Sequence, residues 1–171
     1  MRSWIRKNKH AVAAFLLNFC CAFLSLAVFI VLGGGIFSLS NDYNAQEWSF
    51  NMFASQAIKN GEIFWNWNID LGSDFITTFS FYNLGSPFFW IMLLFPVKSI
   101  PYLMGWVYML KYAVAGLTSY LFLARFSENK RISVCCSLLY AFCGFQCCNL
   151  VFYHFHDVVA LFPLLLLGLE I

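Results

Sequence analysis

Charged residues are scarce in this sequence: 11% of its 171 residues are Asp, Glu, Lys or Arg, whereas 61% are hydrophobic. An ordinary soluble domain carries about 25% charged residues. The sequence also lacks a glycine-rich phosphate-binding loop, a catalytic serine motif and the basic patches of nucleic-acid-binding proteins. These absences argue against a soluble domain and against nucleic acid as a partner, and they predict a protein whose solvent is the lipid bilayer.

Zinc-type cysteine pairs are also absent. The sequence holds seven cysteines, but none forms a CxxC pair with a second pair at a suitable distance. All seven fall within the expected membrane spans, where cysteine serves as a small apolar packing residue. We therefore assign the cysteines no chemistry.

Long apolar runs are present where charge is missing. A helix of about 20 residues crosses the ~30 Å hydrocarbon core of a bilayer, and such runs occupy about residues 11–37, 101–124 and 133–152. A signal peptide is the alternative for the first run, but signal cores span only about 7–15 residues. A fourth run, 158–171, is incomplete, which predicts that the protein continues beyond it. We expect an all-α, polytopic transmembrane domain over 1–171.

Basic residues gather on two segments. Four precede the first span and three follow the second: Arg2, Arg6, Lys7 and Lys9, then Arg125, Lys130 and Arg131. Because Lys and Arg accumulate on the cytoplasmic side, we expect a multi-pass membrane protein with a cytoplasmic N-terminus. The loop 38–100 is then extracellular, as is the turn 153–157. Asn8 and Asn129 should lie inside and Gly61 outside.

The long outer loop is expected to carry an amphipathic surface helix. Its apolar stripe has the spacing i, i+3, i+4, i+7 and i+8, at Phe50, Phe53, Ala54, Ala57 and Ile58. Asn44 with Glu47 three residues on resembles a capping box, and Lys59 before Gly61 is typical of a helix C-terminus. We expect this helix to lie flat on the outer membrane surface, with Glu47 as a cap.

Asp42 stands between the first span and this surface helix. A carboxylate at this depth can meet the headgroup of a lipid-linked substrate whose tail stays in the bilayer. The alternative is a solvated aspartate that initiates the helix, since acidic residues commonly precede helices. Position alone leaves both interpretations open.

Four other residues are candidates for binding. Asp157 lies in the second outer turn with His154 and His156, where metal or substrate binding competes with capping of the next helix. Lys111 falls near the middle of the second span, where a charge costs ~2.5–3.5 kcal/mol. Lys111 should either meet a phosphate group or pair with a carboxylate in helices beyond this sequence.

A family resemblance rests on the order of short motifs. These are Asn41-Asp42-Tyr43, Trp65–Ser73, Ser86-Pro87-Phe88, Leu94-Phe95-Pro96, Leu110–Thr118, Leu139–Phe145, and His156-Asp157 before Leu161-Phe162-Pro163-Leu164. In this order the chain resembles the bacterial YfhO-type membrane proteins, a branch of the GT-C glycosyltransferase superfamily. Cys143 stands where a serine is expected, a departure that touches packing more than chemistry.

The resemblance implies an inverting transferase that moves a sugar from a polyprenyl-phosphate carrier to an extracytoplasmic cell-envelope polymer such as teichoic acid. It implies that Asp42 acts as general base or helps to hold a divalent metal. Substrate binding would then fall to Asp157, His156, His154 and Lys111. The alternatives are a transporter or lipid-linked-sugar flippase, in which Lys111 is a coupling charge, and a noncatalytic assembly module.

Overall fold

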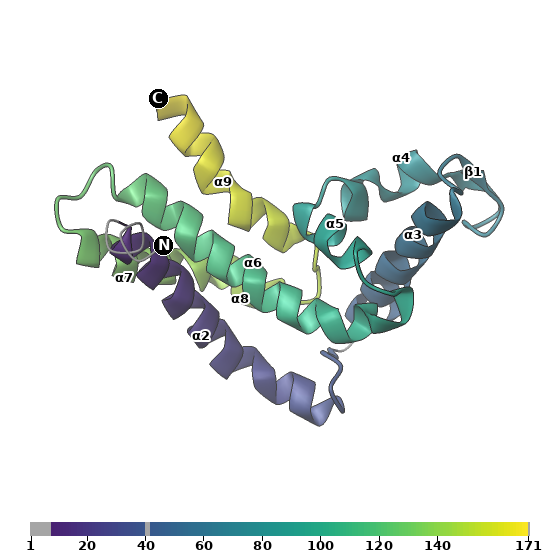
Figure 1. The fold of residues 1–171 in the computed structure, drawn as a ribbon, viewed down its shortest axis with the longest axis horizontal. Coiled ribbons are helices and arrows are strands. Elements are labelled where there is room, and N and C mark those ends of the chain that lie inside the picture. The colour runs from purple at the N-terminus through teal and green to yellow at the C-terminus, as the bar shows by residue number, and fades with distance from the viewer. Residues whose placement is uncertain (1–7, 40–41, 171) are drawn as a thin grey trace. The chain divides into compact units, whose positions relative to one another are not determined.

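The computed structural model describes residues 8–39 and 42–170 (Figure 1). The basic residues Arg2, Arg6 and Lys7 and the motif residue Asn41 lie outside this described part. The chain divides into two compact units: a helical unit of residues 1–28, 108–150 and 155–171, and a loop unit of residues 29–107 and 151–154.

Helices make up most of the described chain, so the expected helical class is confirmed. The longer ones are α2 (Lys9–Leu32), α3 (Trp48–Asn60), α6 (Ile100–Leu123), α7 (Lys130–Ala141) and α9 (Phe155–Glu170). The shorter ones are α4 (Phe75–Phe79), α5 (Pro87–Leu93), α8 (Gly144–Cys148), the π-helical turns η1 (Tyr43–Glu47) and η2 (Ser80–Leu84), and the 3₁₀ turn η3 (Val97–Ser99). Strands β1 (Trp65–Asn66) and β2 (Ser73–Asp74) pair antiparallel.

Two helical stretches of the described chain are long and apolar enough to cross a membrane: Lys9–Leu32 and Lys130–Cys148. With 24 residues, α2 extends about 36 Å at 1.5 Å per residue. Its large apolar side chains are widely exposed, with Leu24 and Leu32 at 78% and 80%. Such an exposed apolar surface suits contact with lipid. Helix α6 is equally long but carries Lys111 and several tyrosines, which lower its mean hydropathy.

The helix boundaries differ from the expected spans in two places. Helix α2 ends at Leu32 because Gly34 and Gly35 adopt left-handed φ angles of 64° and 98°, which stop a helix. The expected span 133–152 is interrupted between α7 and α8, where the backbone of Cys143 is extended. That apolar run is therefore two helices rather than one.

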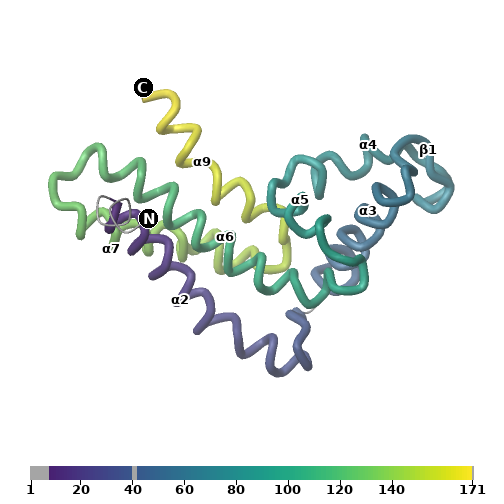
Figure 2. The backbone as a smooth tube through the Cα atoms, in the orientation of Figure 1, coloured from purple at the N-terminus to yellow at the C-terminus, as the bar shows by residue number. Residues whose placement is uncertain are grey.

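Helix α6 is the element on which the helical unit packs (Figure 2). A Cβ atom at Gly116 would lie 2.1 Å from Asn18 Nδ2 of α2, so only glycine allows this contact. Asn18 in turn donates to Ser137 Oγ of α7 at 3.4 Å. On another side, Thr118 Oγ1 donates to the Ala160 carbonyl of α9 at 2.8 Å. Small residues and side-chain hydrogen bonds of this kind hold helices together in lipid.

In the loop unit, α3 packs against α4 and η2. The Phe50 ring lies 5.5 Å from the Phe79 ring and 5.0 Å from the Tyr82 ring, measured between centroids. Helix α3 ends where predicted, because Gly61 adopts a left-handed φ of 78°. Of the five residues in the predicted apolar stripe, Ala54 and Ala57 are buried, and they share the buried face with the polar residues Asn51 and Ser55.

The orientation of the loops can be tested with single cysteines added to the chain. We expect a membrane-impermeant maleimide to label Asn60→Cys in intact cells above the parent level, because this exposed position ends α3 in the loop expected outside. Asn8→Cys and Glu128→Cys should react only after permeabilisation. Position 61 is avoided because cysteine is strained at its left-handed φ. The opposite pattern would place Asp42 on the cytoplasmic side.

Candidate functional site

Asp42 lies directly before η1 and is exposed. Its backbone is itself helical, with φ −59° and ψ −25°, and its carboxylate makes no capping hydrogen bond. An N-cap residue has a non-helical backbone and accepts a hydrogen bond from the first turn. Asp42 therefore makes no capping hydrogen bond, although it is exposed and stands directly before η1. Its carboxylate is available to solvent or to a substrate.

The turn after Asp42 is wider than an α-helical turn. The Trp48 N–H donates to the Tyr43 carbonyl, which closes the i to i+5 ring of a π-helix. Such turns are rare in proteins, and those that do occur are often found at functional sites. The predicted capping box is also wrong: Asn44 lies inside η1 and accepts from the Leu39 N–H at 3.1 Å, while the Glu47 side chain makes no cap.

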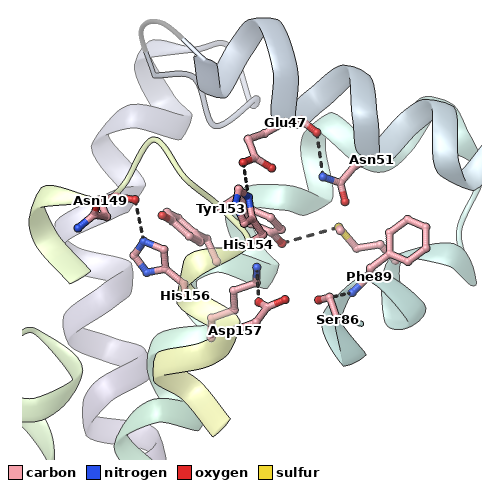
Figure 3. A network of polar contacts seen from close by, with 12 residues as sticks. Glu47, Asn51, Ser86, Phe89, Asn149, Tyr153, His154, His156 and Asp157 are labelled. Carbon is pink, nitrogen blue, oxygen red and sulfur yellow. Dashed lines mark hydrogen bonds and ion pairs between the residues drawn. The ribbon is translucent and has the colours of Figure 1, made fainter. Parts of the chain in front are cut away.

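The Glu47 carboxylate is used in a buried pair instead. Glu47 Oε1 lies 2.8 Å from His154 Nδ1, and the two side chains are only 2% and 6% exposed (Figure 3). The rings of Phe81 and Tyr82 pack against the imidazole, with centroids 4.9 and 4.7 Å away. Because these rings exclude water, the electrostatic interaction inside the pair is stronger than it would be at the surface.

Other buried polar groups lie on the face of η1 and α3 that carries Glu47. Glu47, Asn51 and Ser55 follow one another at i, i+4 and i+8 and are all buried, as is Asn83 of η2. Glu47 Oε2, Asn51 Oδ1, Ser55 Oγ and the Asn83 amide have no hydrogen-bond partner in the described part of the chain. Each such group costs about 1–3 kcal/mol, so a cluster of them marks a candidate polar site rather than a packing core.

Aromatic residues fix the segment that carries His154. Tyr153 donates its hydroxyl to Met92 Sδ at 3.9 Å, and its ring lies 6.3 Å from the Tyr43 ring. Burial and the nearby Glu47 carboxylate raise the pKa of Tyr43 well above its usual value. The Tyr43 phenol therefore stays protonated at neutral pH.

The helical unit contains a second buried pair. Lys111 Nζ of α6 lies 2.6 Å from Asp157 Oδ1 of α9, with side chains 0% and 12% exposed. Next to Asp157 in the chain, His156 places Nε2 3.1 Å from the Asn149 carbonyl, and its ring packs 4.6 Å from the Tyr108 ring. Pairing was one of the two roles predicted for Lys111, but its partner is Asp157 within this chain.

The predicted binding residues thus divide between the two units. His154 belongs to the loop unit with Glu47, whereas His156, Asp157 and Lys111 belong to the helical unit. Among the described residues, no three His, Cys, Asp or Glu side chains are placed to hold a metal ion together. The described residues therefore offer no such group of ligands for the divalent metal that the resemblance implies.

The Glu47–His154 pair should show energetic coupling. We expect Glu47→Ala and His154→Ala each to lower the Tm of the detergent-solubilised protein, because each removes one partner of a buried polar contact. A double-mutant cycle should give a coupling of about 0.5–3 kcal/mol, as for other residues in contact. Strictly additive effects would mean that the 2.8 Å contact does not stabilise the protein.

The comparisons with known proteins fit this membrane architecture. No curated protein and no solved structure matches the chain. The family described as "Bacterial membrane protein YfhO" matches residues 13–171, which is nearly the whole chain. The matched region includes Asp42 and both buried pairs. The resemblance predicted from motif order is confirmed, and the chain belongs to the YfhO family of bacterial membrane proteins.

Proposed function

We propose that the protein is a membrane glycosyltransferase that moves a sugar from a polyprenyl-phosphate carrier to an extracytoplasmic cell-envelope acceptor such as teichoic acid. The observation that carries the proposal is the state of Asp42, an exposed carboxylate with no capping bond at the start of the long loop. It follows the apolar helix α2 in the chain. A lipid-linked sugar can reach such a position while its tail stays among lipids.

The chemistry assigned to Asp42 is that of a general base. The Asp42 carboxylate takes the proton from an acceptor hydroxyl while the hydroxyl oxygen attacks the anomeric carbon. The bond from that carbon to the phosphate oxygen breaks, and the polyprenyl phosphate leaves with the electron pair. One displacement without a covalent intermediate inverts the configuration at the anomeric carbon.

The buried Glu47–His154 pair is assigned a positioning role. Glu47 is the last residue of η1, and η1 begins directly after Asp42. The 2.8 Å contact with His154 therefore fixes the far end of the turn that carries the base. A catalytic carboxylate must be held to within a fraction of an ångström, so such support affects the rate.

The test is transfer of a labelled sugar by the protein in membranes. Polyprenyl phosphate charged with the labelled sugar is mixed with cell-envelope polymer, and polymer-bound label of inverted configuration is the expected product. A protein that moves the intact lipid-linked sugar across a proteoliposome membrane, and leaves the polymer unlabelled, would overturn the proposal in favour of a flippase. In that case the buried Lys111–Asp157 pair would be the natural coupling charge.

A further inference from the structure

A pocket of about 360 Å³ opens beside α3 in the loop unit. Its walls and rim come from eight residues: Ser49, Phe50, Phe53, Asn68, Ile69, Asp70, Thr78 and Phe79. The volume lies in the range of small-molecule sites. No lysine or arginine is among these lining residues, so the pocket offers no positive charge to a phosphate or another anion.

Three phenylalanine rings form the apolar wall. The Phe53 and Phe79 rings stack at 5.6 Å with an interplanar angle of 27°, and the Phe50 ring meets the Phe79 ring edge-on at 87°. Phe79 is only 3% exposed. Rings held against one another in this way give a rigid surface that loses little entropy when a ligand packs on it.

The rim carries a carboxylate on an unusual backbone. Asp70 has a φ of 54°, the only positive φ of a non-glycine residue in the described chain. Residues in this region of φ are often found at ligand sites. Backbone hydrogen bonds hold the turn on both sides, from the Ile69 N–H to the Asn66 carbonyl at 3.4 Å and from the Gly72 N–H to the Ile69 carbonyl at 2.8 Å.

The polar groups on the rim are not equally available. The Thr78 hydroxyl already donates to the Asp74 carbonyl at 2.8 Å and lies 3.1 Å from Ser73 Oγ. The side chains of Asp70 and Asn68 are exposed and have no hydrogen-bond partner in residues 8–39 and 42–170. An acceptor carboxylate and an amide therefore stand free beside the aromatic wall.

We propose that this pocket binds an uncharged pyranose ring. The inference rests on the proposed function and names the class of sugar handled in the loop unit. The C–H face of a pyranose packs on phenyl rings, while its hydroxyls donate to the Asp70 carboxylate and the Asn68 amide oxygen. A hydrocarbon tail would desolvate Asp70 without giving it a donor. Phosphate is disfavoured because the lining has no basic residue.

The binding test uses saturation-transfer NMR on the full-length protein in detergent, with methyl α- and β-glucopyranoside and methyl N-acetylglucosaminide as probes. We expect saturation to reach the ring protons of at least one glycoside. Phe53→Ala should abolish it. Asp70→Gly keeps the left-handed backbone but loses the carboxylate, and should weaken binding about tenfold, the effect of one charge-assisted hydrogen bond. Asp70→Asn should retain more affinity than Asp70→Gly, because its amide oxygen still accepts.

Choline is the probe that distinguishes a sugar site from a cation site, because an aromatic wall with a carboxylate also binds a quaternary ammonium. A choline signal that Asp70→Asn and Asp70→Gly abolish alike, with no glycoside signal, would overturn the proposal. Phe126→Ala and Glu128→Gln, exposed positions outside the pocket, should leave glycoside binding unchanged. Should Phe53→Ala fail to fold, the comparison of the two Asp70 variants decides.

The Asp42→Asn variant distinguishes the proposal for the pocket from the proposed transferase function. Asp42→Asn should lose sugar transfer and still bind the glycoside, because Asp42 is not part of the pocket lining. Glycoside binding without any transfer by the parent protein would overturn the proposed function alone. Transfer without glycoside binding would overturn the pocket alone.

Discussion

Lys111→Met should sharply reduce the amount of folded protein in the membrane. The substitution leaves the Asp157 carboxylate, 12% exposed, without the ammonium that lies 2.6 Å away. Breaking a buried ion pair by removing one partner costs about 3–5 kcal/mol, a large share of a typical stability of about 5–15 kcal/mol. The measurement is the yield of monodisperse protein after extraction in mild detergent, together with its Tm.

Three variants separate charge pairing from other roles of Lys111. Lys111→Arg keeps the positive charge and should be partly tolerated. Lys111→Met combined with Asp157→Leu removes both charges, so it should recover much of the lost yield, since replacing a whole buried pair by apolar residues is often neutral. A well-expressed, fully active Lys111→Met protein would show that the pair contributes nothing. If the double variant folds normally but loses activity, Lys111 or Asp157 takes part in function.

Local sequence rules located the C-terminal end of α3 well and side-chain partners poorly. Gly61 was predicted to end the loop helix, and its left-handed φ does so, because the chemistry of a helix C-terminus is contained in a few adjacent residues. The cost of Lys111 inside a span was likewise predictable from one residue. Its pairing with Asp157 was not, since partner choice depends on how α6 and α9 pack.

Glu47 shows why the rest of the site escaped prediction. Its spacing from Asn44 fits a local capping rule, so the carboxylate was assigned to the helix end. In the structure it contacts His154, 107 residues further along the chain. A cap contributes only about 1 kcal/mol, whereas a carboxylate left buried without its partner costs about 3–5 kcal/mol. The break in the apolar run 133–152 was also missed. Apolar residues continue on both sides of Cys143, so the hydropathy of the run does not show where α7 ends.

Asp42→Asn should lower the transfer rate about 10²–10⁴-fold, the range for loss of a general base. Asparagine has nearly the same shape but cannot accept the proton of the acceptor hydroxyl. Because Asp42 makes no capping bond, the substitution removes no hydrogen bond from η1, and expression and Tm should stay at parent values. The measurement is initial transfer of labelled sugar at saturating donor.

Asp74→Asn is the matched control. Asp74 caps α4 by accepting from the Thr77 N–H at 2.7 Å, a bond that asparagine also makes. Hydrogen bonds from the Thr77 backbone N–H and then its hydroxyl lower the pKa of Asp74. The stabilisation from this carboxylate is present above the ordinary carboxyl pKa and is lost only as the pH falls through the lowered value. At neutral pH the cap is intact, so this Asp→Asn change should leave the transfer rate near that of the parent.

The comparison of the two variants decides the role of Asp42. Both lose one negative charge from the loop unit, exposed at Asp42 and half-buried at Asp74, so a nonspecific effect of charge on the approach of the donor would lower both rates. A loss confined to Asp42→Asn requires chemistry at that carboxylate. Asp42→Glu should restore part of the rate, because it returns a base on a side chain one methylene longer. Equal rates for Asp42→Asn and Asp74→Asn would remove Asp42 from the mechanism and leave the family membership without an assigned base.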